Sequence, residues 1–431
     1  MQGRDAVLRI LRGLGWGLLG LVVLVLLAWT VSRMWPLPER QREQVRLLED
    51  VRPLPGRNGF ALLWTLPYDG LDRTQREAAL ALDVQRWQAG PRAGMADSAL
   101  SADHPALVLA PQGRCGAAGV DCLAALRADP QGFSAAHAGH DELHARLDSL
   151  ADFDRFDTPF RPLDTDWLMP FPRYSLLMDG SGAHALAYER GDIEGALAAS
   201  CRSVQLGRRL MRNGGTLLDS MMGAALVRTH VQLMADMLAE QAPEQVLPAA
   251  CEGALQPLAA AEQSLCRAMQ GEFAMNKGAI DSALRQRFSG LLLDREKTVG
   301  RIAENFGWAC GPASRQALDA DRPIRPAAVR RWDIGCLANV FGCSLSDIAT
   351  PVYQEYAARS QDAAAWVRLL GAQRWLRQQP DAPAVALARL PARWRSPART
   401  PVLSADGKRL QVLRYAPATK GEGGQMLSVP L

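Results

Sequence analysis

The sequence predicts a mainly α-helical protein with one N-terminal transmembrane helix, stacked antiparallel helical hairpins and a small C-terminal antiparallel β-meander. Three observations support this fold class. Residues 13–31 form an uncharged apolar run, and apolar residues recur at helical spacing between residues 174 and 240. Near the C-terminus, alternating apolar residues surround an Asp-Gly pair, which is typical of a β-hairpin.

The apolar run at residues 13–31 is long enough to cross a membrane. It contains no charge, and Arg12 and Arg33 bracket it. At a rise of ~1.5 Å per residue, a helix of this length spans about 28 Å, close to the roughly 30 Å of the hydrocarbon core. Trp16 and Trp29 lie near its ends, where indole rings favour the headgroup level. A cleaved signal peptide has a shorter apolar region and a small-residue cleavage site, so we expect an uncleaved anchor.

The basic residues do not settle the orientation of this anchor, because they flank it on both sides. Long downstream domains translocate largely regardless of charge. We therefore expect a single-pass protein of the inner (cytoplasmic) membrane, with its C-terminal domain in the periplasm. The formal net charge of +4 is small for 431 residues and no basic block is present, which excludes a nucleic-acid partner.

The eight cysteines are an even number, which favours an oxidising compartment. Three pairs are disulfide candidates by their spacing: Cys115 and Cys122, Cys336 and Cys343, and Cys251 and Cys266. The first two pairs repeat one short spacing and are the better supported. Cys201 and Cys310 have no close neighbour in the sequence. Alternatively, several cysteines, Cys201 and Cys266 above all, form no disulfide and act as small buried apolar residues.

The order of patterns along the chain divides it into eight regions. These are a cytoplasmic tail (1–12), the transmembrane helix (13–31), a juxtamembrane spacer (32–56), an N-terminal helical and loop-rich region (57–173), a central helical bundle (174–289), a variable linker (290–325), C-terminal helices (326–399) and a small β-hairpin or meander (400–431).

The clearest periodicity predicts three antiparallel helices between residues 174 and 240. The first ends at Gly191, the residue type favoured at a left-handed helix stop, and Asp192 caps the second. The third follows an Asn-Gly-Gly break, and its Gly223 and Ala224 allow a neighbouring helix to approach closely. A further hairpin is expected at 244–258 and 260–284.

The remaining expectations concern the second half of the chain. We expect a long excursion over residues 290–325, helices at 326–341, 344–358 and 361–378, and strands at 402–405, 409–415 and 425–429.

Four stretches in this order carry a resemblance to a known group of proteins. They are NGFALLWTLPYDG at 58–70, CGAAGVDCLAALRADP at 115–130, GDIEGALAASCRSVQLGRRL at 191–210, and a Tyr-x-x-Tyr-x-x-Arg run at 353–359. The chain resembles uncharacterised proteobacterial single-pass, membrane-anchored, mostly helical proteins. The resemblance spans most of the region after the anchor. Such proteins have no assigned catalytic residues, so it implies no site residue and no cofactor.

The sharpest local pattern for chemistry is HAGHDELH. Its His137, His140 and His144 are spaced i, i+3 and i+7, which places them on one face if the segment is a single helix. His140 and His144 have the spacing of the two zinc ligands in H-E-x-x-H, although Asp141 replaces the glutamate. The alternatives are adventitious metal binding, a catalytic zinc with His137 as third ligand, and a solvated polar helix face. We expect the solvated face and no cofactor.

Other chemistry-bearing patterns each lack a required residue. Asp179, Ser181 and His184 lie close together but without the strand-to-helix elbow of a nucleophilic serine. The acidic run at 152–157 lacks the glycine and glutamate of a calcium loop. The Glu-x-x-His pairs of a di-iron bundle are absent from the sequence.

With no complete catalytic pattern, the expected function is a protein-interaction or scaffold module of the cell envelope, with a protein partner at the membrane. Whether the protein is an enzyme stays open, and the sequence leans against it. A methionine-rich helix supplies either an adaptable partner surface or core filling: Met221, Met222, Met234 and Met237. The alternative function is a metal-dependent envelope hydrolase that uses His137, His140 and His144.

Overall fold

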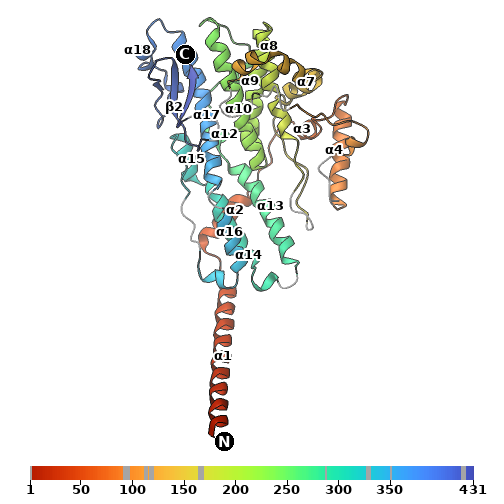
Figure 1. The fold of residues 1–431 in the computed structure, drawn as a ribbon, viewed down its shortest axis with the longest axis vertical. Coiled ribbons are helices and arrows are strands. Elements are labelled where there is room, and N and C mark those ends of the chain that lie inside the picture. Colours follow the sequence, from red (N-terminus) through yellow and green to blue (C-terminus); the bar gives the residue numbers. More distant parts are fainter. Residues whose placement is uncertain are drawn as a thin grey trace.

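The protein is mainly helical: helices make up 64% of the structure, and there is one small three-stranded antiparallel sheet among the described residues (Figure 1). The computed structural model describes residues 2–90, 98–110, 115, 121–163, 169–286, 289–326, 332–349, 352–418 and 424–431. This agrees with the predicted fold class. The finer expectation, a stack of antiparallel hairpins, stays a prediction.

An apolar helix, α1 (Gln2–Met34), leaves the base of the body (Figure 1). Its segment Leu11–Met34 is long and apolar enough to cross a membrane, and its most apolar window is not buried. Among the described residues no other helix meets this criterion. A membrane anchor and a signal sequence share these properties.

Residues 32–56 do not form the spacer expected from the sequence. They contain α2 (Glu39–Glu49), which packs against α14 (Arg295–Phe306) in the base of the body. Leu37 and Leu48 are buried there. Because the apolar side chains of this segment are covered by the body, α1 is joined to the body without an intervening spacer.

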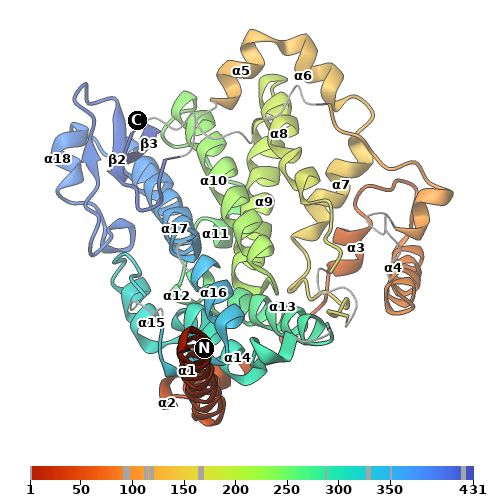
Figure 2. The same cartoon turned by 60° about the horizontal axis from the view of Figure 1, so that its bottom comes forward.

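Four helices form the centre of the body: α8 (Gly180–Glu189), α9 (Ile193–Asn213), α10 (Leu217–Glu240) and α17 (Val352–Arg377). α9 packs against α8 on one side and against α10 on the other, and α17 packs against the far side of α10 (Figure 2). Gly191 has a φ of +91° after α8, and the Asp192 carboxylate accepts a hydrogen bond from the Gly195 amide at 3.0 Å. The predicted helix boundaries therefore agree with the structure.

Other helices surround this centre: α3 (Phe60–Trp64), α4 (Arg73–Gln88), α5 (Cys122–Ala128), α6 (Pro130–His137), α7 (Asp141–Leu150), α11 (Cys251–Ala254), α12 (Ala260–Gln263), α13 (Cys266–Leu284), α15 (Pro312–Asp319), α16 (Val340–Ala349) and α18 (Pro383–Leu387). The helix expected at 244–258 shrinks to the single turn α11. The reason is Pro248, which disfavours helical backbone before it and removes a donor.

The expected excursion at residues 290–325 is wrong, because α14 and α15 fill most of it. Asp294 caps α14 by accepting a hydrogen bond from the Lys297 amide at 3.1 Å. Four buried side chains follow at i, i+3, i+4 and i+7, which is a complete helical stripe: Val299, Ile302, Ala303 and Phe306. The signal for this helix was therefore in the sequence. Of the helix expected at 326–341, residues 327–331 lie outside the described residues, and a 3-10 turn, Ile334–Leu337, follows.

The C-terminal sheet has the order β1 (Val402–Leu403), β2 (Arg409–Leu413), β3 (Met426–Pro430). Gly407, with a φ of +70°, makes the predicted Asp-Gly turn. A buried arginine, Arg399, ties the segment before the sheet to the rest of the body. Its guanidinium lies 2.6 Å from Asp321 Oδ1 and 2.7 Å from Asp362 Oδ1 on α17.

All eight cysteines are paired at disulfide distance: Cys115–Cys122, Cys201–Cys251, Cys266–Cys310 and Cys336–Cys343. The two short-range pairs are those expected from the spacing. The Cys251–Cys266 pairing is wrong, because each of these residues pairs with a cysteine that has no close neighbour in the sequence. Packing brings α11 against α9 and the 3-10 turn Gly307–Cys310, which follows α14, against α13, which decides the partners.

The crossing of α9 and α10 depends on two glycines. A Cβ on Gly207 would lie 2.7 Å from the Gly223 carbonyl oxygen, and a Cβ on Gly223 would lie 2.5 Å from the Gly207 carbonyl oxygen. Neither position has room for a side chain, so the two backbones are in direct contact. The close approach expected at Gly223 is thus made by α9.

We predict that Gly207→Ala and Gly223→Ala each lower the free energy of unfolding by about 1–3 kcal/mol, because the added methyl must push two packed helices apart. Denaturant unfolding followed by circular dichroism measures this. Gly253→Ala is the matched control, since a Cβ there meets no atom within 4 Å. Unchanged midpoints for the first two variants would contradict the close crossing.

Candidate metal centre

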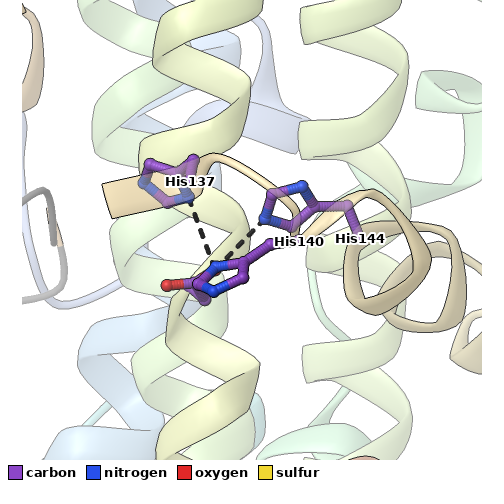
Figure 3. A group of neighbouring side chains, drawn as sticks. His137, His140 and His144 are labelled. Atoms are coloured by element: carbon purple, nitrogen blue, oxygen red, sulfur yellow. Dashed lines mark hydrogen bonds and ion pairs between the residues drawn. The ribbon is translucent and has the colours of Figure 1, made fainter. Parts of the chain in front are cut away.

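The three histidines of HAGHDELH come from two helices and the turn between them (Figure 3). α6 ends at His137, and Gly139 then takes a φ of +78°, a left-handed conformation that glycine adopts without strain. His140 is the residue before α7, and His144 lies in its first turn. The expectation of a single helix with three histidines on one face is therefore wrong, although the three side chains do converge.

A fourth group, Asp179, meets them from a distant part of the sequence. It lies between a 3-10 helix (Tyr174–Met178) and α8, and only 4% of its side chain is exposed. Tyr174 holds this segment in place by donating a hydrogen bond from its hydroxyl to Asp219 of α10. Packing against α9 and α10 thus carries the carboxylate to the α6–α7 turn.

One carboxylate oxygen forms the apex of the cluster. Asp179 Oδ2 lies 3.4 Å from His137 Nδ1, 3.5 Å from His140 Nδ1 and 3.1 Å from His144 Nε2. All four donor atoms lie within 4.8 Å of one another. Two zinc ligands at bond lengths of ~2.0–2.1 Å on a tetrahedron are about 3.3 Å apart, so the three distances from the carboxylate already match a metal site.

The charge of Asp179 is stabilised within the cluster. Burial raises the pKa of this carboxyl, but hydrogen bonds from His137 and His144 and the positive charge of these rings outweigh burial, so the net pKa lies well below the usual range. The group is an ionised carboxylate at neutral pH. A negative oxygen among three imidazoles suits a divalent cation, which would replace ring protons as the partner of the carboxylate.

The burial of the donors also fits a metal ion. The side chains of His137, His140 and His144 are 5%, 11% and 21% exposed, so the cluster is not the solvated face expected from the sequence. His140 Nδ1 is buried, and the Asp179 carboxylate 3.5 Å away does not have the geometry of a hydrogen bond to it. Buried polar atoms of this kind call for a partner, and a metal ion supplies one.

Two further histidines lie behind the cluster. His184 of α8 and His230 of α10 are buried, and their ring centroids are 5.1 Å apart. His184 Nδ1 lies 3.4 Å from Ser200 Oγ, whereas Ser181 donates its hydroxyl to the Met178 carbonyl oxygen at 2.9 Å. Asp179, Ser181 and His184 therefore do not form a nucleophilic triad.

Burial keeps both of these histidines neutral. Burial lowers the pKa of His230 to about 3. Burial, followed by the charges of the neighbouring histidines, also lowers the pKa of His184 well below its ordinary value. Their rings pack as uncharged aromatic groups between α8 and α10.

Sequence reasoning found three of the four donors and missed the fourth. The sequence alone groups Asp179 only with Ser181 and His184, its neighbours in the chain. No spacing rule links it to His144, because the link depends on how α8 packs on α7. An acidic residue directly before a Gly-Ser-Gly helix start was the one local sign of a positioned carboxylate.

The fold and the site define a mainly helical protein with an apolar N-terminal helix and a candidate His3Asp metal centre. Comparison of the chain with protein-family models, with curated proteins and with solved structures found no match.

We predict that His230 contributes to acid sensitivity. Below about pH 6.5 the unfolded chain takes up a proton at this histidine, whereas the folded chain does so only near pH 3. The free energy of unfolding of the metal-free protein therefore falls as pH is lowered through this window, by up to about 1.4 kcal/mol per pH unit from this residue.

Urea unfolding of the wild type and of His230→Leu at a series of pH values measures this contribution. The carboxylates contribute equally to both proteins, so their effect cancels in the difference. The stability of the wild type relative to the variant should be constant above pH 7 and should decrease between pH 6 and pH 4. A difference that does not change with pH would contradict a neutral buried His230.

Proposed function

We propose that the protein binds one divalent transition metal ion, zinc in the first place, through His137, His140, His144 and Asp179. The single observation that carries this proposal is the convergence of three imidazole nitrogens on one buried carboxylate oxygen at 3.1–3.5 Å. Imidazole suits zinc and its neighbours in the first transition row, and a carboxylate completes a four-ligand set.

The ligand set favours a held ion over a catalytic one. Catalytic zinc keeps a coordination position open for water or substrate, whereas four protein ligands close the tetrahedron. Hydrolysis also needs a general base. In H-E-x-x-H this is the glutamate, whose position Asp141 occupies here. The next residue, Glu142, does not replace it, because its carboxylate accepts hydrogen bonds from the Gly70 amide and from Arg146. The hydrolase alternative therefore has less support than a structural or metal-holding site.

A bound ion would add metal bonds between parts of the body that packing and hydrogen bonds already hold together. His137 ends α6, His140 lies in the turn before α7, and Asp179 directly precedes α8. Metal binding would fix these three elements to one another. Because an ion that binds only the folded state stabilises it, the proposal links metal occupancy to the stability of this end of the body.

We further propose that α1 is a retained anchor in the inner membrane and that the body lies in the periplasm. Support comes from the end of α1, where Ser32 is buried and Trp29 Nε1 donates a hydrogen bond to the Leu291 carbonyl oxygen at 2.9 Å. Removal of the helix by cleavage would leave these partners uncovered. Four disulfides are typical of an oxidising compartment such as the periplasm.

The interaction or scaffold role expected from the sequence stays a proposal with weaker support. Met234 and Met237 are fully buried in the core, and Met221 and Met222 are partly buried. Met234 and Met237 therefore fill space between helices, and of the four methionines only Met221 and Met222 are open to a protein partner.

We predict that the full chain, purified in detergent and stripped with a chelator, takes up one zinc ion per molecule. Elemental analysis after gel filtration gives the stoichiometry, and competition with a zinc indicator gives the affinity. Asp179→Asn and His140→Ala should each weaken zinc binding by at least about 100-fold, since each removes a charged or buried donor.

The matched control is His104→Ala, which alters a histidine outside the cluster and should leave zinc affinity unchanged. At zinc concentrations of 100 times the dissociation constant, the wild type should gain about 2.7 kcal/mol of unfolding free energy. A wild type that retains no zinc, or equal losses in His104→Ala and His140→Ala, would refute the metal centre.

We also predict that none of the eight cysteines of the protein in its native membrane reacts with a maleimide after denaturation without reductant. All eight should react after reduction. The number of labels per chain is read by mass spectrometry. Eight labels without reduction would contradict both the disulfides and the periplasmic location.

A further inference from the structure

The base of the body exposes apolar side chains around the end of α1. Leu291 is 55% exposed, Leu292 39%, Leu337 50% and Phe341 54%. We call these four residues the collar. Leu291 and Leu292 belong to a Gly-Leu-Leu-Leu segment, and Leu337 and Phe341 belong to the segment that follows α14 and α15 in the chain.

Hydrogen bonds fix both collar segments to α1. Trp29 donates to the Leu291 carbonyl oxygen at 2.9 Å, and Arg33 donates to the Gly290 carbonyl oxygen at 3.0 Å. The Ala338 amide donates to Ser32 Oγ at 2.9 Å, and both of these residues are fully buried. The collar therefore has a defined height along the helix.

That height coincides with the edge of the hydrocarbon core. The uncharged part of α1 runs from Gly13 to Ser32, twenty residues. At ~1.5 Å per residue this length is about 30 Å, which equals the thickness of the core and puts its outer edge near Ser32 and Arg33. Trp29 lies one turn inside that edge, so Leu291, bonded to it, lies at the boundary between acyl chains and headgroups.

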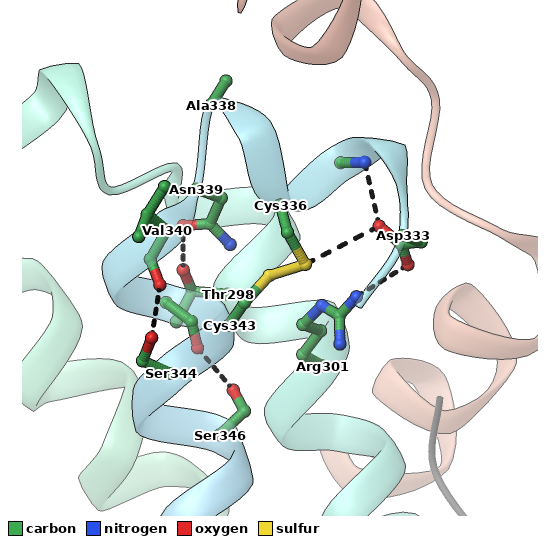
Figure 4. Close-up of a disulfide and its surroundings, with 12 residues drawn as sticks. Thr298, Arg301, Asp333, Cys336, Ala338, Asn339, Val340, Cys343, Ser344 and Ser346 are labelled. Carbon is green, nitrogen blue, oxygen red and sulfur yellow. Dashed lines mark hydrogen bonds and ion pairs between the residues drawn. A yellow bond between two sulfur atoms is a disulfide. The ribbon is translucent and has the colours of Figure 1, made fainter. Parts of the chain in front are cut away.

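The collar is rigid, because a disulfide and an asparagine brace it (Figure 4). The Cys336–Cys343 disulfide closes the segment that carries Leu337 and Phe341. The Asn339 Oδ1 atom accepts hydrogen bonds from the Asp294 amide at 2.8 Å and from Thr298 Oγ1 at 2.9 Å. The Phe341 amide donates to the Leu292 carbonyl oxygen at 3.1 Å, which joins the two segments.

Charges beside the collar are paired within the protein. Arg33 and Lys297 lie 3.5 and 3.6 Å from Asp294, and Arg295 lies 2.5 Å from Asp281. Arg33 and Lys297 share one carboxylate, so a single positive charge remains among these groups and the attraction of the collar to a surface is mainly apolar.

We propose that the collar is a second membrane contact, in which Leu291, Leu292, Leu337 and Phe341 insert into the lipid interface around α1. Apolar side chains of this kind bury about 5–10 Å into the headgroup and acyl boundary. The contact fixes the tilt of the body on the membrane, whereas α1 alone would fix only its attachment. This inference rests on the membrane anchoring proposed above.

Photocrosslinking of the full chain in phosphatidylcholine vesicles tests the proposal. p-Benzoylphenylalanine replaces Phe341 or Leu291 in the two test proteins. In the control it replaces Val385 of α18, which is 58% exposed and lies at the end of the body opposite α1 (Figure 1). Vesicle flotation before irradiation establishes that each protein is anchored.

We expect lipid adducts, identified by mass spectrometry, at positions 341 and 291 in at least tenfold higher yield than at position 385. The yield should change less than twofold when a fifth of the lipid is anionic or when the salt is raised to 1 M. Equal lipid yields at all three positions in floated protein would overturn the collar and leave the anchor intact. Failure of the protein to float would instead overturn the anchor.

Crosslinks from positions 341 and 291 to another polypeptide, including a second copy of the chain, would also overturn the proposal. A second measurement does not depend on the unnatural residue. In floated Leu291→Ser protein, the amides of residues 289–292 should exchange hydrogen at least fivefold faster than in the wild type, and equal rates would contradict lipid insertion at this segment. Leu291 is exposed in the body, so this variant leaves the core unchanged.

Discussion

The direct backbone contact between α9 and α10 at Gly207 and Gly223 is the constraint on which the rest of the structure depends. α7, α8, α11 and α12 pack against α9, whereas α13, α17 and β3 pack against α10. The distance between these two sides is therefore set where neither helix has a side chain. The Cys201–Cys251 disulfide ties α11 to α9 covalently and strengthens the same frame.

The candidate metal centre is a consequence of this frame. Asp179 is positioned by the 3-10 helix before it, which Tyr174 links to Asp219 of α10, and by α8, which packs on α9. His140 and His144 are positioned by α7 and His137 by α6, and Arg202 of α9 donates to the Asp148 carbonyl oxygen of α7 at 2.7 Å. The four side chains thus share one support, which would preorganise them to hold a metal ion.

The collar and the candidate metal centre lie at opposite ends of the molecule. α1 and the collar lie at the base, and α7 and α8 lie at the far end of the body (Figure 1). A metal ion at the cluster would therefore exchange with the aqueous compartment, away from the lipid. Because Leu37 and Leu48 pack α2 into the base, the body is held close to the anchor, so the height of the cluster above the membrane is set by the length of the body.

The sequence by itself determined the local features, which depend on interactions between residues that are close in the chain. The apolar span, the helix start at Asp192 and the turn at Gly407 all follow from local hydrogen bonding or from periodicity. The same short-range spacing indicated His137, His140 and His144 as a group. Only the tertiary structure decided that Gly139 breaks their helix, that Asp179 completes the site, and that Cys251 pairs with Cys201. These contacts join residues brought together by the packing of whole helices, and the free energy of that packing is spread over the core, so no short stretch of sequence encodes it.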